Sequence, residues 1–156
     1  MQRVQRVYAI ALLWMAVVFV GDRLTKIGAS SADALPVGLI PTFLTFVQHH
    51  NEGLIANIPV PMPWIIVISL VALAFIGRLW WRAMQANDLR GVVAFGLIIG
   101  GALGNLYDRL LYGYVIDWIL LFGRSAMNLA DAAILMGIIL VLWRTKESSR
   151  SSAQAV

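Results

Sequence analysis

Four long apolar stretches dominate the sequence and limit the folds that it can adopt. They run over residues 7–27, of which 22–27 carry charges at the expected helix end, and over residues 64–82, 91–111 and 125–143. A helix needs about 20 apolar residues to cross a bilayer, and each stretch is close to that length. A chain of 156 residues that is 60% hydrophobic could not hide so much apolar surface in a soluble core. The sequence therefore predicts an all-α membrane protein with four transmembrane helices.

Between the first two apolar stretches lies a polar segment, residues 28–63, that is too rich in proline to span a membrane. It contains β-branched and aromatic residues on both sides of a turn at Asn51-Glu52-Gly53, which is typical of β structure. We expect a small extracytoplasmic β element between the first and second helices. Residues 1–146 should form a single integral-membrane domain, and the polar residues 147–156 should form a disordered cytoplasmic tail.

The distribution of charge predicts how the chain is oriented. Most of the 12 Lys and Arg residues lie near the two termini and between the second and third stretches, whereas most of the acids lie on the opposite side. Cytoplasmic loops are enriched in Lys and Arg. We therefore expect both termini to be cytoplasmic and residues 28–63 and 108–125 to face outward. The basic residues lie at the ends of apolar runs, so no nucleic-acid partner is expected.

The N-terminal stretch also resembles a cleavable secretory signal, because small residues follow an apolar run. However, Asp22, Arg23 and Lys26 separate the apolar run from the small residues, and three more apolar stretches follow. We therefore expect this stretch to be retained as the first helix, with Asp22 and Lys26 on one face.

Acids at the outer ends of the apolar stretches point to function. Placing an ionisable residue in a transmembrane helix raises the free energy of membrane insertion by about 2.5–3.5 kcal/mol. We therefore treat such a residue as a candidate for a functional role. Asp108 shares a helix face with Asn105 and has Arg109 beside it, so a structural ion pair explains it equally well. Asp117 and Asp131 have no obvious cation and are better catalytic candidates. If they face each other, one can activate water while its protonated partner donates a proton, as in aspartic proteases.

The composition narrows the chemistry further. There is no cysteine, and the two histidines, His49 and His50, are adjacent in the sequence. Disulfides, thiol catalysis and a Cys-ligated metal are excluded, and neither a cofactor nor a metal is expected. A proton-coupled transporter could use the same acids as a relay and remains an alternative. Against it, no polar path continues from these acids to the cytoplasmic side.

Five short motifs occur in order along the chain. Residues 22–26 (DRLTK) fit D-x-x-x-K, and residues 51–53 (NEG) fit N-x-G. Residues 101–109 (GALGNLYDR), together with the preceding Gly100, fit GGALGN-x-x-DR. Residues 115–118 (VIDW) fit V-x-D-F with Trp for Phe, and residues 127–131 (MNLAD) fit F-N-x-A-D with Met for Phe. Each motif is weak by itself. Together, over about residues 8–143, they resemble the bacterial lipoprotein signal peptidase family, also called signal peptidase II.

This resemblance implies an intramembrane aspartyl endopeptidase of the bacterial cytoplasmic (inner) membrane, with its active site at the outer leaflet. Such an enzyme removes the signal peptide from diacylglyceryl-modified prolipoproteins and cuts before the lipidated cysteine. The resemblance implies Asp117 and Asp131 as the catalytic dyad. It implies that a further set binds substrate or supports the site: Asn51, Gly104, Asn105, Asp108, Arg109, Asn128, Ala130, Asp22 and Lys26. The expected partners are the prolipoprotein, membrane lipid and a globomycin-type inhibitor, and a monomer is expected.

One motif departs from the family pattern. After N-x-G the family usually has a small residue and then an aromatic one, as in N-x-G-A-A-F, whereas this chain has Leu54-Ile55-Ala56-Asn57. The departure predicts a different shape or lipobox preference for the outward β segment. It also keeps open the alternative of a catalytically inactive peptidase homologue. His49 and His50, just before the motif, are expected to be interfacial loop residues.

Overall fold

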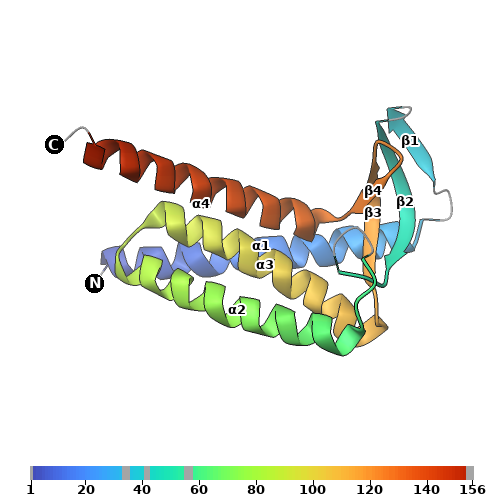
Figure 1. Ribbon diagram of the computed structural model, residues 1–156, viewed down its shortest axis with the longest axis horizontal. Coiled ribbons are helices and arrows are strands. Elements are labelled where there is room, and N and C mark those ends of the chain that lie inside the picture. Colours follow the sequence, from blue (N-terminus) through green and yellow to red (C-terminus); the bar gives the residue numbers. More distant parts are fainter. Residues whose placement is uncertain (1, 33–35, 41–42, 55–57, 154–156) are drawn as a thin grey trace.

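The computed structural model describes residues 2–32, 36–40, 43–54 and 58–153, which form four helices and one sheet. The helices are α1 (Gln2–Ser30), α2 (Met62–Gln85), α3 (Leu89–Tyr112) and α4 (Leu129–Ala153). They run along the length of the molecule, with the sheet at one end (Figure 1). The start of α1 and the end of α4 both lie at the opposite end.

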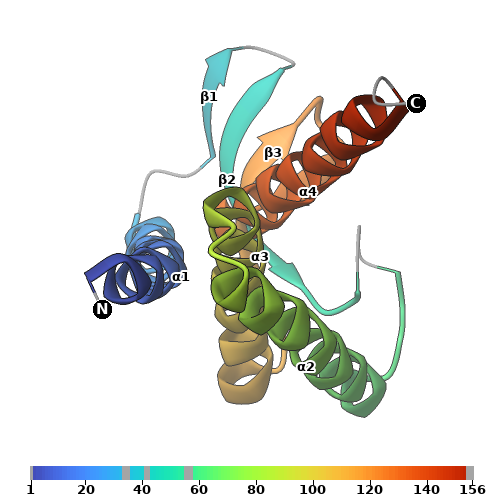
Figure 2. The same ribbon diagram turned by 90° about the vertical axis from the view of Figure 1, so that its left-hand side faces the viewer.

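Helix α3 is central and packs against α1, α2 and α4, as the view along the helices shows (Figure 2). Small residues let the neighbouring helices approach it closely. A Cβ atom added to Gly100 would lie 2.7 Å from the carbonyl oxygen of Met15 on α1, too close for any side chain. Such close backbone contacts are the usual way in which helices associate in a bilayer. The close approach brings polar groups of α1 within reach of α3.

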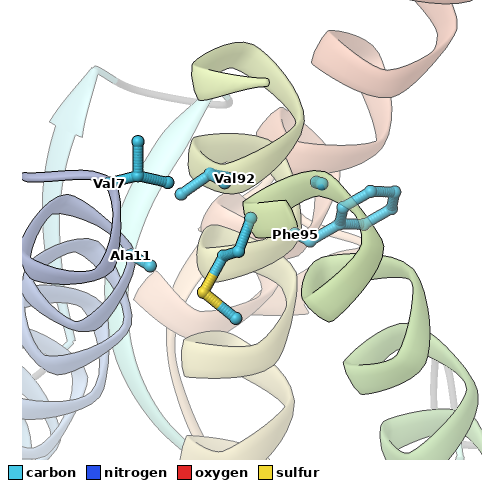
Figure 3. Packing of buried hydrophobic residues seen from close by; sticks show 6 residues of the cluster. Val7, Ala11, Val92 and Phe95 are labelled. Atoms are coloured by element: carbon cyan, nitrogen blue, oxygen red, sulfur yellow. The ribbon is translucent and has the colours of Figure 1, made fainter. Parts of the chain in front are cut away.

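A hydrophobic cluster lies at the helix ends away from the sheet. Val7 and Ala11 of α1 lie beside Val92 of α3, and the ring of Phe95, in the same cluster, points away from α1 (Figure 3). Ala83 and Met84, from the last turn of α2, complete the cluster. This packing holds α1, α2 and α3 together at one end and leaves the other end for polar residues.

The sheet joins two segments that are far apart in the sequence. Its antiparallel strands, in spatial order, are β1 (Val37–Ile40), β2 (Leu44–Asn51), β3 (Val115–Leu121) and β4 (Ser125–Met127). Strand β2 follows α1, and its neighbour β3 follows α3. In this pairing Asp117 lies opposite His49, and Val115 lies opposite Asn51. The sheet therefore places the Asn51 and Asp117 motifs next to each other.

The sheet is larger than the sequence predicted. A β element between the first two helices was expected, and β1 and β2 occur there, but β3 and β4 were not expected as part of the same sheet. Two glycines with positive φ bound β3: Gly113 (φ 78°), which caps the C-terminus of α3, and Gly123 (φ 62°), in the turn before β4. Glycine adopts this conformation without steric cost, so the chain can leave α3 and return as a hairpin.

The helices also differ from their predicted bounds. The stretches 7–27, 64–82 and 91–111 lie within α1, α2 and α3, which extend beyond them at both ends. The predicted start of the fourth helix at residue 125 is wrong, because residues 125–127 form β4 and the helix begins at Leu129. Helix α4 then continues to Ala153, where a disordered tail was expected from residue 147.

Three helical segments in the described part of the chain are long and apolar enough to cross a membrane. They are Gln5–Ser30, Met62–Gln85 and Leu89–Tyr112. The molecule is mostly helical with a small antiparallel sheet, and its long apolar helices fit a membrane protein. The count of four transmembrane helices stays a prediction.

Candidate active site

Buried polar side chains gather where α1, α3 and α4 meet the sheet. Asp22 and Lys26 come from α1, and Asp117 from β3, and each of these side chains is at most 1% exposed. The structure brings all the residues of the predicted site to this region: Asp22, Lys26, Asn51, Gly104, Asn105, Asp108, Arg109, Asp117, Asn128, Ala130 and Asp131. The region divides into two parts that differ in how their acids are held.

The first part is an ionic cluster, which we define as Asp22, Arg23, Lys26 and Asp108. The Lys26 Nζ atom lies 2.9 Å from Asp22 Oδ2 and 2.8 Å from Asp108 Oδ2. Arg23 contacts the same two acids, with Nη2 at 2.8 Å from Asp22 Oδ2 and Nη1 bonded to Asp108 Oδ1. Two acids and two cations therefore neutralise each other in a buried place, where an unpaired charge would be strongly unfavourable.

The ionic cluster also binds backbone groups of neighbouring elements. Asp22 Oδ1 accepts a hydrogen bond from the Ala130 N–H in the first turn of α4 (3.0 Å). Asp108 Oδ2 accepts one from the Ile116 N–H of β3 (3.2 Å). Gly104 makes room for this arrangement, because a Cβ atom there would lie 2.6 Å from Asp22 Oδ2. The cluster thus connects α1, α3, β3 and α4.

Asp108 has a structural ion pair, but its partners are not the residue that the sequence suggested. Asp108 and Arg109 are adjacent on α3, and adjacent helical side chains do not face each other. Asp108 turns towards α1 and meets Arg23 and Lys26. Arg109 instead donates from Nη2 to the carbonyl oxygens of Gly53 (3.1 Å) and Leu54 (3.3 Å). It therefore fixes the backbone that follows β2.

The second part of the site is the acid pair, Asp117 and Asp131. Asp117 lies on β3 and is 0% exposed. Its Oδ2 accepts a hydrogen bond from Asn51 Nδ2 (3.0 Å) and its Oδ1 accepts one from Asn128 Nδ2 (2.6 Å). Asp131 Oδ1 accepts a hydrogen bond from Asn105 Nδ2 (2.7 Å). Side-chain amides therefore hold both carboxylates.

Asn128 links the two acids because it begins α4. Its Oδ1 accepts a hydrogen bond from the Asp131 N–H (2.9 Å), while Asp131 Oδ2 accepts one from the Asn128 N–H (3.3 Å). This reciprocal pair is a capping box, which satisfies free N–H groups at a helix start. The Asn128 Nδ2 atom remains directed at Asp117 and at Asn105 Oδ1 (3.1 Å). Local capping thus fixes the position of Asp131 relative to Asp117.

The two parts of the site differ in charge. The ion pairs found among the described residues include Asp22 and Asp108 but not Asp117 or Asp131. Burial raises the pKa of Asp117 above its ordinary value, and the negative charge of Asp131 raises it further, whereas hydrogen bonds from Asn51 and Asn128 act in the opposite direction. A carboxyl group in this environment favours its protonated form. The acid pair is therefore suited to holding and exchanging a proton.

A pocket of about 360 Å³ opens beside Asp117 on the sheet. Its lining comes from β2, β3 and the β3–β4 hairpin: Val47, Gln48, His49, Asn51, Asp117, Leu120, Arg124 and Ala126. The expectation that His49 and His50 are loop residues is wrong, since both lie in β2. His49 lines the pocket, and the His50 ring stacks on Tyr114 with ring centroids 4.0 Å apart.

Arg23 was not predicted as a site residue. Its guanidinium binds both acids of the ionic cluster and the Gly104 carbonyl oxygen (3.3 Å), and it lies 4.8 Å from the centre of the Tyr107 ring. The signal was present, because Arg23 and Lys26 are three residues apart and share a helix face. Residues 55–57, where the chain departs from the family pattern, lie outside the described residues.

No set of three or more His, Asp or Glu side chains is placed to hold a metal ion in the residues that the structure describes. The carboxylates of the acid pair are bound by amides and a backbone N–H group. The expectation that the protein works without a metal stays a prediction.

The fold and the site together define a membrane protein with a pair of acids at the end of its helices, of which Asp117 is buried and Asp131 is half-buried. The model of the signal peptidase (SPase) II family matches residues 14–146. The chain is 34% identical over 148 residues to the lipoprotein signal peptidase of Shewanella oneidensis, covering 88% of this chain and 87% of that protein. The chain therefore belongs to the signal peptidase II family.

More distant relatives agree with this assignment. The chain is 29% identical over 167 residues to the lipoprotein signal peptidase of Pseudomonas aeruginosa, covering 97% of this chain and 99% of that protein. A solved structure of a bacterial membrane enzyme superposes with a TM-score of 0.79 at 26% identity, covering 89% of this chain and 88% of that one. The similarity thus extends over nearly the whole chain.

Proposed function

We propose that this protein is an intramembrane aspartyl endopeptidase that removes the signal peptide from diacylglyceryl-modified prolipoproteins, cutting before the lipidated cysteine. Its family consists of peptidases that process lipoproteins. The observation that carries the mechanism is the acid pair: amides from Asn51, Asn105 and Asn128 hold Asp117 and Asp131. Such a pair can share one proton, which is what hydrolysis by two carboxyl groups requires.

In the proposed reaction, the ionised member of the pair takes a proton from a water molecule. The resulting hydroxide attacks the carbonyl carbon of the residue before the lipidated cysteine. The protonated member then gives its proton to the leaving amine as the C–N bond breaks. The products are a free carboxylate on the signal peptide and a free amino group on the cysteine. Asn128 positions both acids throughout, because it bonds to each of them.

The pocket beside Asp117 is the proposed place for the substrate chain around the scissile bond. Val47, Leu120 and Ala126 offer apolar contacts, and His49 and Arg124 offer polar ones. A volume of about 360 Å³ is at the low end of the range for ligand pockets. It therefore suits a short peptide segment, with the acyl chains of the substrate remaining outside it.

Two further residues support this pocket as positioning residues. Arg109 holds the carbonyl oxygens of Gly53 and Leu54. Asn51 Oδ1 accepts a hydrogen bond from the Gly53 N–H (3.1 Å), while its amide donates to Asp117. Together they fix the end of β2 relative to the acid pair.

The proposed arrangement in the membrane has four spanning helices, including α4, in one domain of residues 1–146. Both termini face the cytoplasm, and the site lies at the outer leaflet of the bacterial inner membrane. This arrangement is supported by the start of α1 and the end of α4, which lie at the same end of the molecule, away from the sheet (Figure 1). The bias of Lys and Arg in the sequence agrees with it. A monomer in contact with membrane lipid and sensitivity to a globomycin-type inhibitor belong to the same proposal.

The test is a cleavage assay with purified protein in detergent. The substrate is a synthetic lipobox peptide carrying a diacylglyceryl group on its cysteine, and the control is the same peptide without lipid. We expect cleavage directly before the cysteine of the lipidated peptide. Activity without an ion gradient also distinguishes a peptidase from a proton-coupled transporter. A folded protein that leaves the lipidated peptide intact would contradict the proposal and favour an inactive homologue.

A further inference from the structure

A second groove lies between the start of α3 and the distal half of α4, away from the sheet. It has a volume of about 490 Å³ and is lined by Leu89, Arg90, Val93, Leu140, Trp143 and Arg144. The acid pair is at the other end of α3, so this groove takes no part in the proposed hydrolysis. Its chemistry calls for a separate explanation.

The lining of the groove combines apolar and cationic side chains. Val93 and Leu140 are half-buried and give an apolar surface between the two helices, while Arg90 and Arg144 contribute positive charge at its rim. Trp143 is 65% exposed beside them, and exposed tryptophans are enriched where a membrane meets water. A ligand that fits this lining has a negatively charged head and an apolar tail.

Arg144 is held in place at the first turn of α3. Its Nη2 atom lies 2.7 Å from Asp88 Oδ2, and Asp88 Oδ1 in turn caps α3 by accepting a hydrogen bond from the Gly91 N–H (3.0 Å). Gly91 leaves space for the guanidinium, because a Cβ atom there would lie 3.0 Å from Arg144 Nη1. The Arg144 side chain nevertheless remains 43% exposed. A guanidinium has five N–H donors, so an ion pair with Asp88 leaves capacity for an anion.

We propose that this groove binds an anionic phospholipid of the surrounding leaflet. Arg90 and Arg144 contact the lipid phosphate, and one acyl chain lies against Val93 and Leu140. Charge complementarity supports this ligand: the partly exposed Arg144 keeps N–H donors beyond its ion pair with Asp88, Arg90 lines the same groove, and the start of α3 adds the positive end of a helix dipole. Basic sites between transmembrane helices bind anionic lipid head groups by the same chemistry. The apolar surface of the groove favours a lipid over free phosphate.

The proposal is tested by native mass spectrometry of the delipidated full-length protein with equal amounts of phosphatidylglycerol and phosphatidylcholine. We expect the wild-type protein to retain phosphatidylglycerol preferentially. The variants R90Q and R144Q should each lower its affinity for phosphatidylglycerol about fivefold, the effect expected for one arginine at a membrane surface. The matched controls are R78Q and R82Q, which remove exposed arginines of α2 outside the groove. They should retain the wild-type preference.

A second variant tests the proposal in the opposite direction. Asp88→Asn keeps a side-chain oxygen that can cap α3 but removes the carboxylate that competes for Arg144. We expect this variant to bind phosphatidylglycerol more tightly than the wild-type protein, so the test does not depend on a variant that loses binding.

Three outcomes would overturn the proposal. Equal retention of the two lipids by the wild-type protein would remove the preference for an anion. A loss in R78Q or R82Q as large as in R144Q would show that general positive charge, and not the groove, attracts the lipid. Displacement of phosphatidylglycerol by inorganic phosphate at the same concentration would show that the phosphate alone is recognised.

Discussion

The site contains two pairs of acids that differ in their partners. Asp22 and Asp108 each contact Arg23 and Lys26. Asp117 and Asp131 accept hydrogen bonds from asparagine side chains and a backbone N–H group. All four acids lie where the helices meet the sheet. Their residue type and location are therefore similar, and the neighbouring groups make the difference.

This difference separates a structural role from a chemical one. A carboxylate between two cations acts as their counter-ion and is a poor proton acceptor, because protonation would leave the cations buried and unpaired. A carboxyl group that is hydrogen-bonded to neutral amides, without a cation beside it, can both accept and release a proton. Substitutions in the acid pair should therefore change activity, whereas substitutions in or next to the ionic cluster should change stability.

The largest expected effect comes from replacing an acid of the pair proposed for catalysis. Asp117→Asn or Asp131→Asn should lower the cleavage rate of the lipidated peptide about 10²–10⁴-fold, the usual contribution of a general acid or base. The measurement is the single-turnover rate with purified variants of verified fold. Glu52→Gln is the matched control, since it removes an exposed acid beside Asn51 and should keep the wild-type rate. A normal rate in D117N would refute the assignment of the dyad.

A smaller effect, on stability, is expected from the ionic cluster. Lys26→Met should lower the free energy of unfolding by about 3–5 kcal/mol, because it leaves buried carboxylates without one of their cations. The measurement is equilibrium unfolding in a denaturing detergent. Arg82→Met removes an exposed cation and should change stability by no more than about 0.5 kcal/mol. If K26M were as stable as wild type, the cluster would not have the structural role assigned to it.

The fit of α1 against α3 predicts a more moderate effect. Gly104→Ala places a Cβ atom 2.6 Å from Asp22 Oδ2, and such overpacking typically costs about 1–3 kcal/mol. Gly28→Ala on α1 is the matched control, because no atom lies within 4 Å of its added Cβ. That variant should be neutral or slightly stabilising in the same unfolding experiment. Equal destabilisation of the two variants would mean that Gly104 does not act through Asp22.

The smallest expected effect is on the pH dependence of stability. Because the pKa of Asp117 is raised in the folded protein, chiefly by burial, the folded state keeps a proton that the unfolded chain releases near pH 3.9. Stability from this group is therefore fully present below about pH 3.9 and is lost as the pH rises through the folded pKa. Thermal unfolding should show that D117N lacks this decline, while E52Q retains it. An identical pH slope in wild type and D117N would contradict the raised pKa.

Much of the helical fold could be predicted from the sequence. Apolar length located α1, α2 and α3, because a bilayer sets both the length and the polarity of a spanning helix. The start of α4 was predicted too early, because residues 125–127 adjoin an apolar run and could belong to the same helix. The capping box of Asn128 and Asp131 marks the true start. This capping box places Asp131 in the first turn of α4.

The parts that could not be predicted depend on contacts between distant segments. Strand β3 was not expected in the sheet, because its partner, β2, is separated from it in the sequence by α2 and α3. The sequence motifs named Asp22 and Lys26 and passed over Arg23, whose contact with Asp108 requires the close approach of α1 and α3. The sequence motifs thus predicted which residues form the site. The packing of the helices and the sheet determines which of these residues contact one another.

The division of the site along the chain limits when the protein can first act during its synthesis. Because Asn128 and Asp131 follow Asp22, Lys26 and Asp117 in the sequence, the ribosome adds them after these residues. An elongating chain that ends at the last residue of β3 carries Asp117 and Asn51 but lacks Asn128, the second asparagine that binds Asp117. If Asp117 and Asp131 are the catalytic pair, we predict that hydrolysis begins only after α4 has been synthesised and has packed against the other helices.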